Sequence, residues 1–339
     1  MADDLKLGLT LGYWMGTGDD ATESVLAAER LGYDSVWTAE SYGSDAFTPL
    51  AWYGARTSRI KLGTSVVQIA ARTPAATAMA AVTLDHLSGG RLLLGLGASG
   101  PQVVEGWYGV PFPKPLARTR EYVELLRAMW RREGPVSSAG PHYPLPYPGG
   151  TGLGKPLKLN VHPLRPAISV YIGAEGPKNV ALAAEIADGW LPLFTHPEKL
   201  GDMYGEALAA APPGFDVAAM VSVMVTDDLR GALDAAKMTL GFYIGGMGAR
   251  GRNFHLDIVE RMGFGEAGRE VQELFLAGRR DEAIRAVPDE LADGICLLGP
   301  IGRIRERLEL WRKSPVTSLL VMGPRDEPTL RAIRDLVLG

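Results

Sequence analysis

The chain has 339 residues, 46% of them hydrophobic and 22% charged, which is enough for one large domain with a full core or for two small ones. Its formal net charge of -4 lacks the clustered positive charge that attracts nucleic acids and anionic membranes, so we expect a small-molecule substrate and neither of those partners. A single cysteine excludes an internal disulfide or a thiolate metal site, and the five histidines have no metal-binding spacing, so no metal is expected.

The N-terminal sequence, MADDLKLGLTLGYW, carries two acidic residues where a signal peptide would carry basic ones. No apolar run approaches the ~20 residues that a membrane span requires. Together with the single cysteine, these features lead us to expect a cytoplasmic protein.

In the first part of the chain, short apolar runs alternate with amphipathic segments. Strands are predicted at 5–12, 35–40, 61–69 and 91–97, and the helices that follow them at 22–32, 49–58, 73–90 and 115–132. Thr22 suits the cap at the start of the first helix and Gly32 its end. Pro74 suits the first turn of the third helix.

A segment rich in glycine and proline, residues 134–166, separates this part from a second series of strands and helices. Strands are predicted at 167–174, 189–194, 217–228, 294–299 and 318–323, and helices at 177–189, 196–210, 229–244 and 302–313. A long helical stretch at about 253–287 interrupts the alternation.

Repeated strand–helix units predict a parallel sheet covered by helices. About eight such units in a chain of this length favour a closed TIM (βα)8 barrel over an open doubly wound sheet. We therefore expect one α/β domain spanning 1–339, with insertions at 134–166 and 248–290 near the carboxyl ends of the strands. In such a barrel the ligand site lies at those ends.

The stretch from Gly95 to Gly100 spells GxGxxG directly after a predicted strand. A dinucleotide-binding turn leads straight into a helix, whereas here Pro101 follows the third glycine and the next well-patterned helix begins only around Pro115. The motif therefore matches in letters but not in context. Its glycines either let the backbone approach a flat ligand or form a tight turn.

Other polar and aromatic residues follow the predicted strands. Glu40 ends the second strand and is a candidate general acid or ligand anchor, or else a carboxylate that is solvated in the loop or paired with an arginine. Tyr13 and Trp14 follow the first strand and either line the substrate side or pack in the core. In the 248–290 region, Arg250 and Arg252 are either contacts for an acidic ligand or solvated surface charges.

The fifth strand leads into a helix through a glycine-containing turn. The free N–H groups at the helix start, the helix dipole and Lys178 together predict an anion site, although an ordinary helix N-terminus has the same local pattern. The residues of this turn are Gly173, Ala174, Glu175, Gly176, Pro177, Lys178 and Asn179.

The chain resembles a known family over nearly its whole length, and three segments carry the resemblance most clearly. They are GTSVVQIAARTPAATAMAAVTLDHLSGGR, GLGASGPQVVEGWYGVPFPKPLARTREYVELLR and YIGAEGPKNVALAAEIADGW. This order and content resemble the luciferase-like flavin and deazaflavin oxidoreductases, and within them the branch that uses coenzyme F420. The resemblance implies a TIM barrel, usually a homodimer, with the deazaflavin lying across the strand ends.

The resemblance also implies residue roles. Ser65 and Val66 match the position of a non-prolyl cis peptide in a bulge behind the ring. Gly97 and Ala98, in the glycine turn after the fourth strand, are expected to bind the coenzyme as well. Residues 173–179 match the phosphate cradle. Glu40 matches an acidic position near the reacting face, whereas Ser41 stands where the sugar-phosphate dehydrogenase of the family has a histidine.

At the position of that enzyme's catalytic acid this chain has Gly100, so sugar-phosphate oxidation is not expected. The resulting hypothesis is hydride transfer between F420 and an organic substrate that the sequence does not identify, in a pocket lined by Tyr13, Trp14 and Ser41. One alternative is an FMN-dependent monooxygenase on the same barrel. The other is a non-catalytic deazaflavin or flavin carrier.

Overall fold

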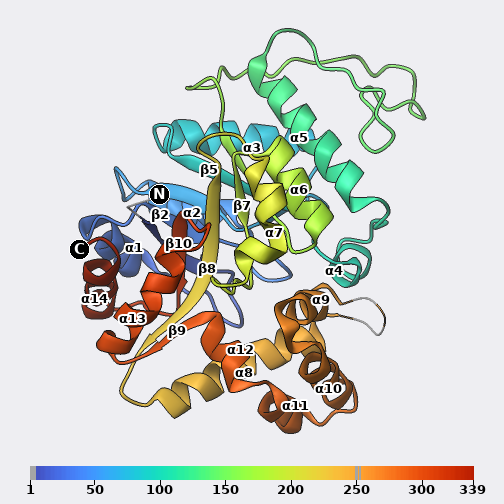
Figure 1. Ribbon diagram of the computed structural model, residues 1–339. Helices are drawn as coiled ribbons and strands as arrows, with labels where there is room; N and C mark the ends of the chain where they lie inside the picture. The colour runs from blue at the N-terminus through green and yellow to red at the C-terminus, as the bar shows by residue number, and fades with distance from the viewer. Residues whose placement is uncertain (1–4, 249–250, 252) are drawn as a thin grey trace.

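A computed structural model describes residues 5–248, 251 and 253–339 (Figure 1). The strands are β1 (Lys6–Gly12), β2 (Ser35–Thr38), β3 (Lys61–Thr64), β4 (Val67–Gln68), β5 (Leu92–Gly97), β6 (Ser169–Gly173), β7 (Gly189–Leu191), β8 (Asp216–Val225), β9 (Cys296–Gly299) and β10 (Ser318–Met322). The first helices are α1 (Thr22–Arg30), α2 (Phe47–Gly54), α3 (Pro74–Leu87), α4 (Pro101–Gly106), α5 (Pro115–Arg131), α6 (Pro177–Ile186) and α7 (Leu200–Ala209).

The remaining helices belong to the C-terminal third of the chain. They are α8 (Leu229–Gly246), α9 (Phe254–Val259), the π-helix η1 (Glu260–Phe264), α10 (Gly265–Leu276), α11 (Arg280–Ala286), α12 (Asp289–Gly294), α13 (Ile301–Arg312) and α14 (Glu327–Val337). The last of these was not among the predicted elements.

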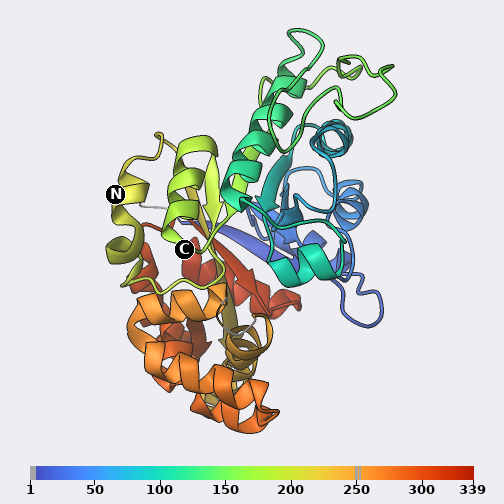
Figure 2. The same ribbon diagram turned by 90° about the vertical axis from the view of Figure 1, so that its right-hand side faces the viewer.

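The strands form a closed parallel barrel. From β1 the order runs through β2, β3, β5, β6 and β7 to β8, and β10 closes the ring because it pairs with both β8 and β1. In register, Ser318 lies opposite Lys6 on one side and opposite Ala218 on the other. The predicted TIM barrel is therefore confirmed, with helices around the outside of the sheet (Figure 2).

The strand β9 does not belong to this closed ring. It pairs only with the last part of β8, from Ser222 to Val225, whereas β10 pairs with β8 from Ala218 to Ser222. The long strand β8 thus extends past the barrel rim, and β9 continues the sheet toward the insertion that precedes it in the chain (Figure 1).

The barrel interior is filled by aromatic and aliphatic side chains. Trp37 meets Tyr171 edge to face at 5.4 Å between ring centroids. Glycine at position 63 makes room for the indole, because a Cβ there would lie 2.2 Å from the Trp37 ring. The rest of this interior cluster comprises Leu93, Leu191, Ala218 and Leu320, packed against Val66 and Met220.

The insertion between β8 and β9 has its own apolar cluster. It joins buried residues of α8 to α12 with Cys296 and Leu298 of β9 and with Phe194, which follows β7. These helices lie together below the carboxyl end of β8 in Figure 1, so the predicted position of the 248–290 insertion at the strand ends is correct.

The predicted position of the 134–166 segment is wrong. This segment leaves the end of α5 and returns to the start of β6, so both of its ends lie at the amino ends of the strands. Arg165 there binds Asp85 at 2.8 Å and the carbonyl oxygen of Leu92, the first residue of β5. The physical reason is connectivity: a segment that follows a helix emerges on the face opposite to one that follows a strand.

Some predicted helix boundaries are confirmed and one is not. Pro74 is the first residue of α3, behind Thr73, whose side chain caps the helix. Gly32 has a φ of 84°, as expected after the end of a helix. Thr22 is not a cap but the first helical residue, since the residue before the helix is Ala21. The N–H and hydroxyl of Thr22 both donate to the side chain of Asp20.

Within the described part of the chain, none of the helices combines the length and apolar character that crossing a membrane requires.

Candidate active site

The predicted third strand is broken at its carboxyl end. It forms two pieces, β3 and β4, separated by Ser65 and Val66, and the peptide between these two residues is cis, as predicted. The Ser65 N–H donates to Thr38 O at 2.6 Å, and its hydroxyl points to the sulfur of Met220 at 3.7 Å. The break therefore lies between β2 and the barrel interior, at the mouth of the barrel.

The Val66 side chain occupies space left by two glycines of neighbouring strands. A Cβ on Gly97 of β5 would lie 2.4 Å from Val66 Cγ2, and one on Gly173 of β6 would lie 3.0 Å from Cγ1. Gly95 likewise admits the carbonyl oxygen of Thr64, which would lie 1.9 Å from an added Cβ. These glycines therefore serve the close approach of the β3–β4 segment, a role that neither sequence interpretation included.

The turn after β5 also differs from the prediction. Helix α4 begins at Pro101, directly after Gly100, so a short helix does follow the glycine motif. Proline suits this first helical position because its missing N–H would have no partner there. The left-handed residue of the turn is Ser99, with a φ of 60°, and no glycine of the motif has a positive φ.

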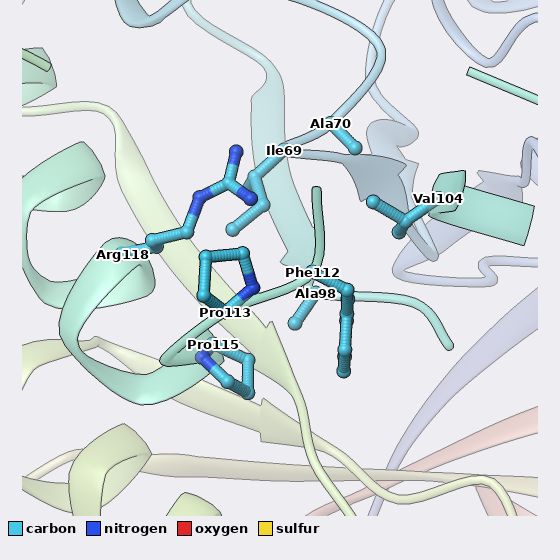
Figure 3. A pocket seen from close by; sticks show the side chains of 8 residues that line it. All are labelled: Ile69, Ala70, Ala98, Val104, Phe112, Pro113, Pro115 and Arg118. Carbon is cyan, nitrogen blue, oxygen red and sulfur yellow. The ribbon is translucent and has the colours of Figure 1, made fainter. Parts of the chain in front are cut away.

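Beside this turn lies a small apolar hollow (Figure 3). It is bounded by the ends of β4 and β5, by α4 and by the start of α5, and the Arg118 side chain extends along one edge. The other lining residues are Ile69, Ala70, Ala98, Val104, Phe112, Pro113 and Pro115. The hollow thus adjoins the predicted ring position at Gly97 and Ala98 and supplies apolar surface there.

Glu40 is buried and fully engaged in hydrogen bonds. Arg72 Nη1 lies 2.7 and 2.8 Å from its two carboxylate oxygens, and the N–H of Gln68 donates to Oε1 at 2.8 Å. The N–H of Ala46 donates to Oε2 at 3.3 Å. This arrangement favours the interpretation of Glu40 as the partner of an arginine, since it holds β4 in place with no oxygen left for a substrate.

The predicted anion site lies at the start of α6. Gly176 is the residue before the helix, no side chain caps it, and a Cβ added there would meet nothing within 4 Å. Pro177 is the first helical residue and Lys178 is exposed beside it. The N–H groups of Asn179 and Val180 bind Gly176 O at 2.9 Å, which fixes the loop against the helix. The geometry leaves an open, uncapped helix N-terminus next to a lysine, as anion binding requires.

The Glu175 carboxylate beside this opening is only partly hydrogen-bonded. Its Oε1 accepts the N–H of Leu193 at 2.8 Å, while Oε2 is buried without a hydrogen-bond partner among the described residues. Burial raises the pKa of this carboxyl group to about 8, against the opposing effects of the Leu193 hydrogen bond and of Arg261. Glu175 is therefore largely protonated at neutral pH and adds little negative charge near the anion site.

Three side chains that sequence analysis missed hold the backbone of this loop. Trp190 Nε1 donates to Ala174 O at 2.8 Å, and Tyr204 donates its hydroxyl to Glu175 O at 2.6 Å. Arg261, from η1 of the insertion, donates to the same oxygen at 2.9 Å. No local pattern indicates these residues, because each comes from a different element.

Tyr13, Trp14 and Ser41 lie together, as a shared pocket would require. Burial, followed by the nearby Tyr42 hydroxyl, raises the pKa of Tyr13 against the opposing effect of the Ser41 side chain beside it. The close approach of these loops depends on Gly43, where a Cβ would lie 2.8 Å from the Tyr13 ring and 2.3 Å from Trp14 O. The loops after β1 and β2 therefore form one wall at the barrel mouth.

Arg250 and Arg252 lie outside the described residues, so their roles stay predictions. Across residues 5–248, 251 and 253–339, the structure contains no group of histidine, cysteine and acidic side chains that could hold a metal ion.

The fold and this site define a class: a TIM-barrel protein with an open, uncapped helix N-terminus and a broken strand at the barrel mouth. The chain belongs to the luciferase-like monooxygenase family, whose model matches residues 10–318. The chain is 53% identical to a Mycobacterium tuberculosis protein provisionally named a coenzyme F420-dependent oxidoreductase, over 99% of both chains.

Two other comparisons agree with this family, one in sequence and one in fold. The chain is 32% identical to the 5,10-methylenetetrahydromethanopterin reductase of Archaeoglobus fulgidus, over 88% of both sequences. Its fold matches that of the coenzyme F420-dependent tetrahydromethanopterin reductase of Methanopyrus kandleri with a TM-score of 0.80 at 22% identity, covering 99% of both chains.

Proposed function

We propose that this protein is an oxidoreductase that transfers a hydride between coenzyme F420 and an organic substrate. The observation that carries the proposal is the Val66 side chain at the barrel mouth, which packs against Gly97 and Gly173. The 53% identity to a protein named as a coenzyme F420-dependent oxidoreductase supports it. A flat ring at the mouth would have this side chain as a wall behind one of its faces.

The residues present fit such a coenzyme at both of its ends. Ser65, Val66, Gly97 and Ala98 would contact the ring, with the apolar hollow beside Ala98 continuing the surface. The loop 173–179 would hold the phosphate, because Gly176 leaves open space before an uncapped helix. When bound, the coenzyme supplies the carbon that gives or accepts the hydride, and the protein supplies orientation and a shaped pocket.

In this proposal Glu40 is a positioning residue. Its carboxylate binds Arg72 and the N–H of Gln68, so it orients β4 directly after Val66. Proton transfer to the substrate would then fall to hydroxyl or imidazole groups at the mouth, or to water.

We further propose a homodimer, which light scattering of the purified protein would test.

A second candidate is an FMN-dependent monooxygenase. The matching family is described as luciferase-like monooxygenase, and the same helix N-terminus would bind the FMN phosphate. The two candidates differ in the coenzyme that binds and in whether molecular oxygen is consumed.

The test is a fluorescence titration of the purified apo-protein with F420 and, separately, with FMN. We expect F420 to bind at least about tenfold more tightly, a difference of ~1.4 kcal/mol. Reduced F420 should then be oxidised on addition of an acceptor without consumption of oxygen. Tighter FMN binding with oxygen consumption would support the second candidate, and binding of neither coenzyme would contradict both.

A further inference from the structure

Five aromatic side chains from widely separated segments gather at the barrel mouth, and we call them the mouth cluster. Tyr13 follows β1, Tyr42 follows β2 and Phe194 follows β7, whereas Tyr243 lies on α8 and His255 on α9. The strand ends and the insertion therefore both contribute to one place. None of these residues belongs to the ring wall or to the phosphate loop.

Ring contacts join three of these residues. Tyr243 meets Phe194 at 5.4 Å and His255 at 5.0 Å between ring centroids, and Phe194 meets His255 at 5.8 Å, each pair edge to face. Tyr13 and Tyr42 lie close enough to act on Tyr243 electrostatically: after burial, they are the next causes that raise its pKa, to about 12. Three of the side chains thus pack together, and the hydroxyls of Tyr13 and Tyr42 lie near them.

The mouth cluster is uncharged at physiological pH. Burial lowers the pKa of His255 to about 4, so its imidazole is neutral, and Tyr13 and Tyr243 have raised pKa values. The nearby Arg72 is already paired with two carboxylates, Glu40 at 2.7 Å and Asp45 at 3.8 Å, so it offers no free positive charge. An anionic substrate group placed against the cluster would therefore lose its hydration without gaining an opposite charge.

The cluster also holds a polar atom without a protein partner. Nδ1 of His255 is buried and forms no hydrogen bond in the described part of the chain. A buried polar nitrogen of this kind is normally satisfied by another polar group or by water. In its two tautomers the neutral imidazole can either donate a hydrogen bond from this nitrogen or accept one there.

We propose that the mouth cluster binds an uncharged substrate with a flat unsaturated or aromatic ring, and that His255 hydrogen-bonds to its polar group. The inference rests on the proposed function, since it assigns the substrate side of that site. Aromatic edges and faces suit a planar apolar ring, and phenol and imidazole groups supply polar contacts without charge. Phosphorylated and carboxylate substrates are disfavoured.

The test compares two probes with the same ring system, 2-naphthaldehyde and its charged analogue 6-formyl-2-naphthoate. Isothermal titration calorimetry is performed on the intact protein, with and without F420. We expect the neutral probe to bind at least about tenfold more tightly than the carboxylate. Equal or tighter binding of the carboxylate, or binding of neither probe, would overturn the proposal.

Variants locate the binding within the cluster. Tyr243→Ala should weaken 2-naphthaldehyde binding about tenfold, whereas Phe254→Ala, on an exposed ring adjacent to His255 (38% exposed), should leave it unchanged. His255→Phe keeps a ring but removes both nitrogens, so the protein should bind 2-naphthaldehyde no better than 2-methylnaphthalene. Unchanged binding in both Tyr243→Ala and His255→Phe would contradict the assignment.

A coenzyme titration of the same variants separates this inference from the proposed function. Tyr243→Ala and His255→Phe should bind F420 as the unmodified protein does. If the unmodified protein binds neither F420 nor FMN but the probe results hold, the proposed function fails while the uncharged, ring-binding character of the cluster stands.

Discussion

The two sides of the barrel mouth are formed by different chemical groups. On the proposed coenzyme side, neighbouring strands β3 to β6 and the start of α6 supply glycines, backbone groups and one ion pair with a buried carboxylate. On the proposed substrate side, aromatic side chains come from segments as distant in the sequence as Tyr13 and Tyr243. A backbone-built surface specifies one ligand shape, whereas a surface of side chains can change by substitution without altering the fold. The proposed division of labour follows from this difference.

Breaking the ion pair on the coenzyme side should have the largest effect. Arg72→Met leaves the buried Glu40 carboxylate without its opposite charge, so we expect the free energy of unfolding to fall by about 3 kcal/mol. Chemical denaturation measures this. Arg56→Met is the control, because Arg56 is exposed and stacks on Trp52 away from the mouth. A loss equal to that of the control would show that Glu40 does not depend on Arg72.

The helix N-terminus should show the next largest effect. Gly176→Glu adds a negative charge in open space beside the anion site, so coenzyme affinity should fall on the order of 100-fold while stability changes little. Gly302→Glu, at the start of α13 and also in open space, is the matched control and should bind coenzyme normally. Unchanged titration curves for Gly176→Glu would remove the phosphate assignment.

The buried acid next to this loop should make stability depend on pH. Burial raises the pKa of Glu175 from its ordinary 4.5 to about 8. Between these values the unfolded chain has lost the proton that the folded chain keeps, so the contribution of Glu175 to stability falls as pH rises through this window. Glu175→Gln cannot titrate, so relative to the unmodified protein it should gain up to ~1.4 kcal/mol for each pH unit between the two pKa values, and nothing below pH 4.

Denaturation curves for both proteins at several pH values measure this difference. A difference that stays constant between pH 4 and pH 8 would mean that Glu175 is ionised in the folded protein.

A smaller effect is expected at the ring wall. Val66→Ala leaves space over Gly97 and Gly173, so the ring would be held less firmly. Turnover should fall about tenfold while coenzyme affinity changes by less than about threefold, because the phosphate contacts are elsewhere. Steady-state kinetics and titration measure the two quantities. Equal losses in both would mean that Val66 contributes to binding rather than to orientation.

The smallest effect is expected on the substrate side. Trp14 is 39% exposed, so Trp14→Ala should cost less than about 1 kcal/mol in stability and leave F420 affinity unchanged. Stopped-flow titration with the coenzyme provides the measurement. A clear loss of F420 affinity would show that the two sides of the mouth are not separate.

Sequence patterns by themselves determined the strand–helix alternation, the barrel and the glycine-containing turn before α6, where anion binding stays a prediction. These features depend on local periodicity, on helix-start residues and on a strand followed at once by a helix, all of which lie within a few residues of one another. The break at Ser65 and Val66 was reached through resemblance alone, since GTSVV reads as plain strand.

Only the tertiary structure decided the partners of these residues. Glu40 pairs with Arg72, Glu175 O binds both Tyr204 and Arg261, and Tyr243 meets Phe194 and His255. Each pair joins residues that closure of the barrel or folding of the insertion brings together, and no local pattern records such distances. Which face of the barrel carries the 134–166 segment was likewise decided by chain connectivity, because composition marks a loop but not the end of the barrel from which it emerges.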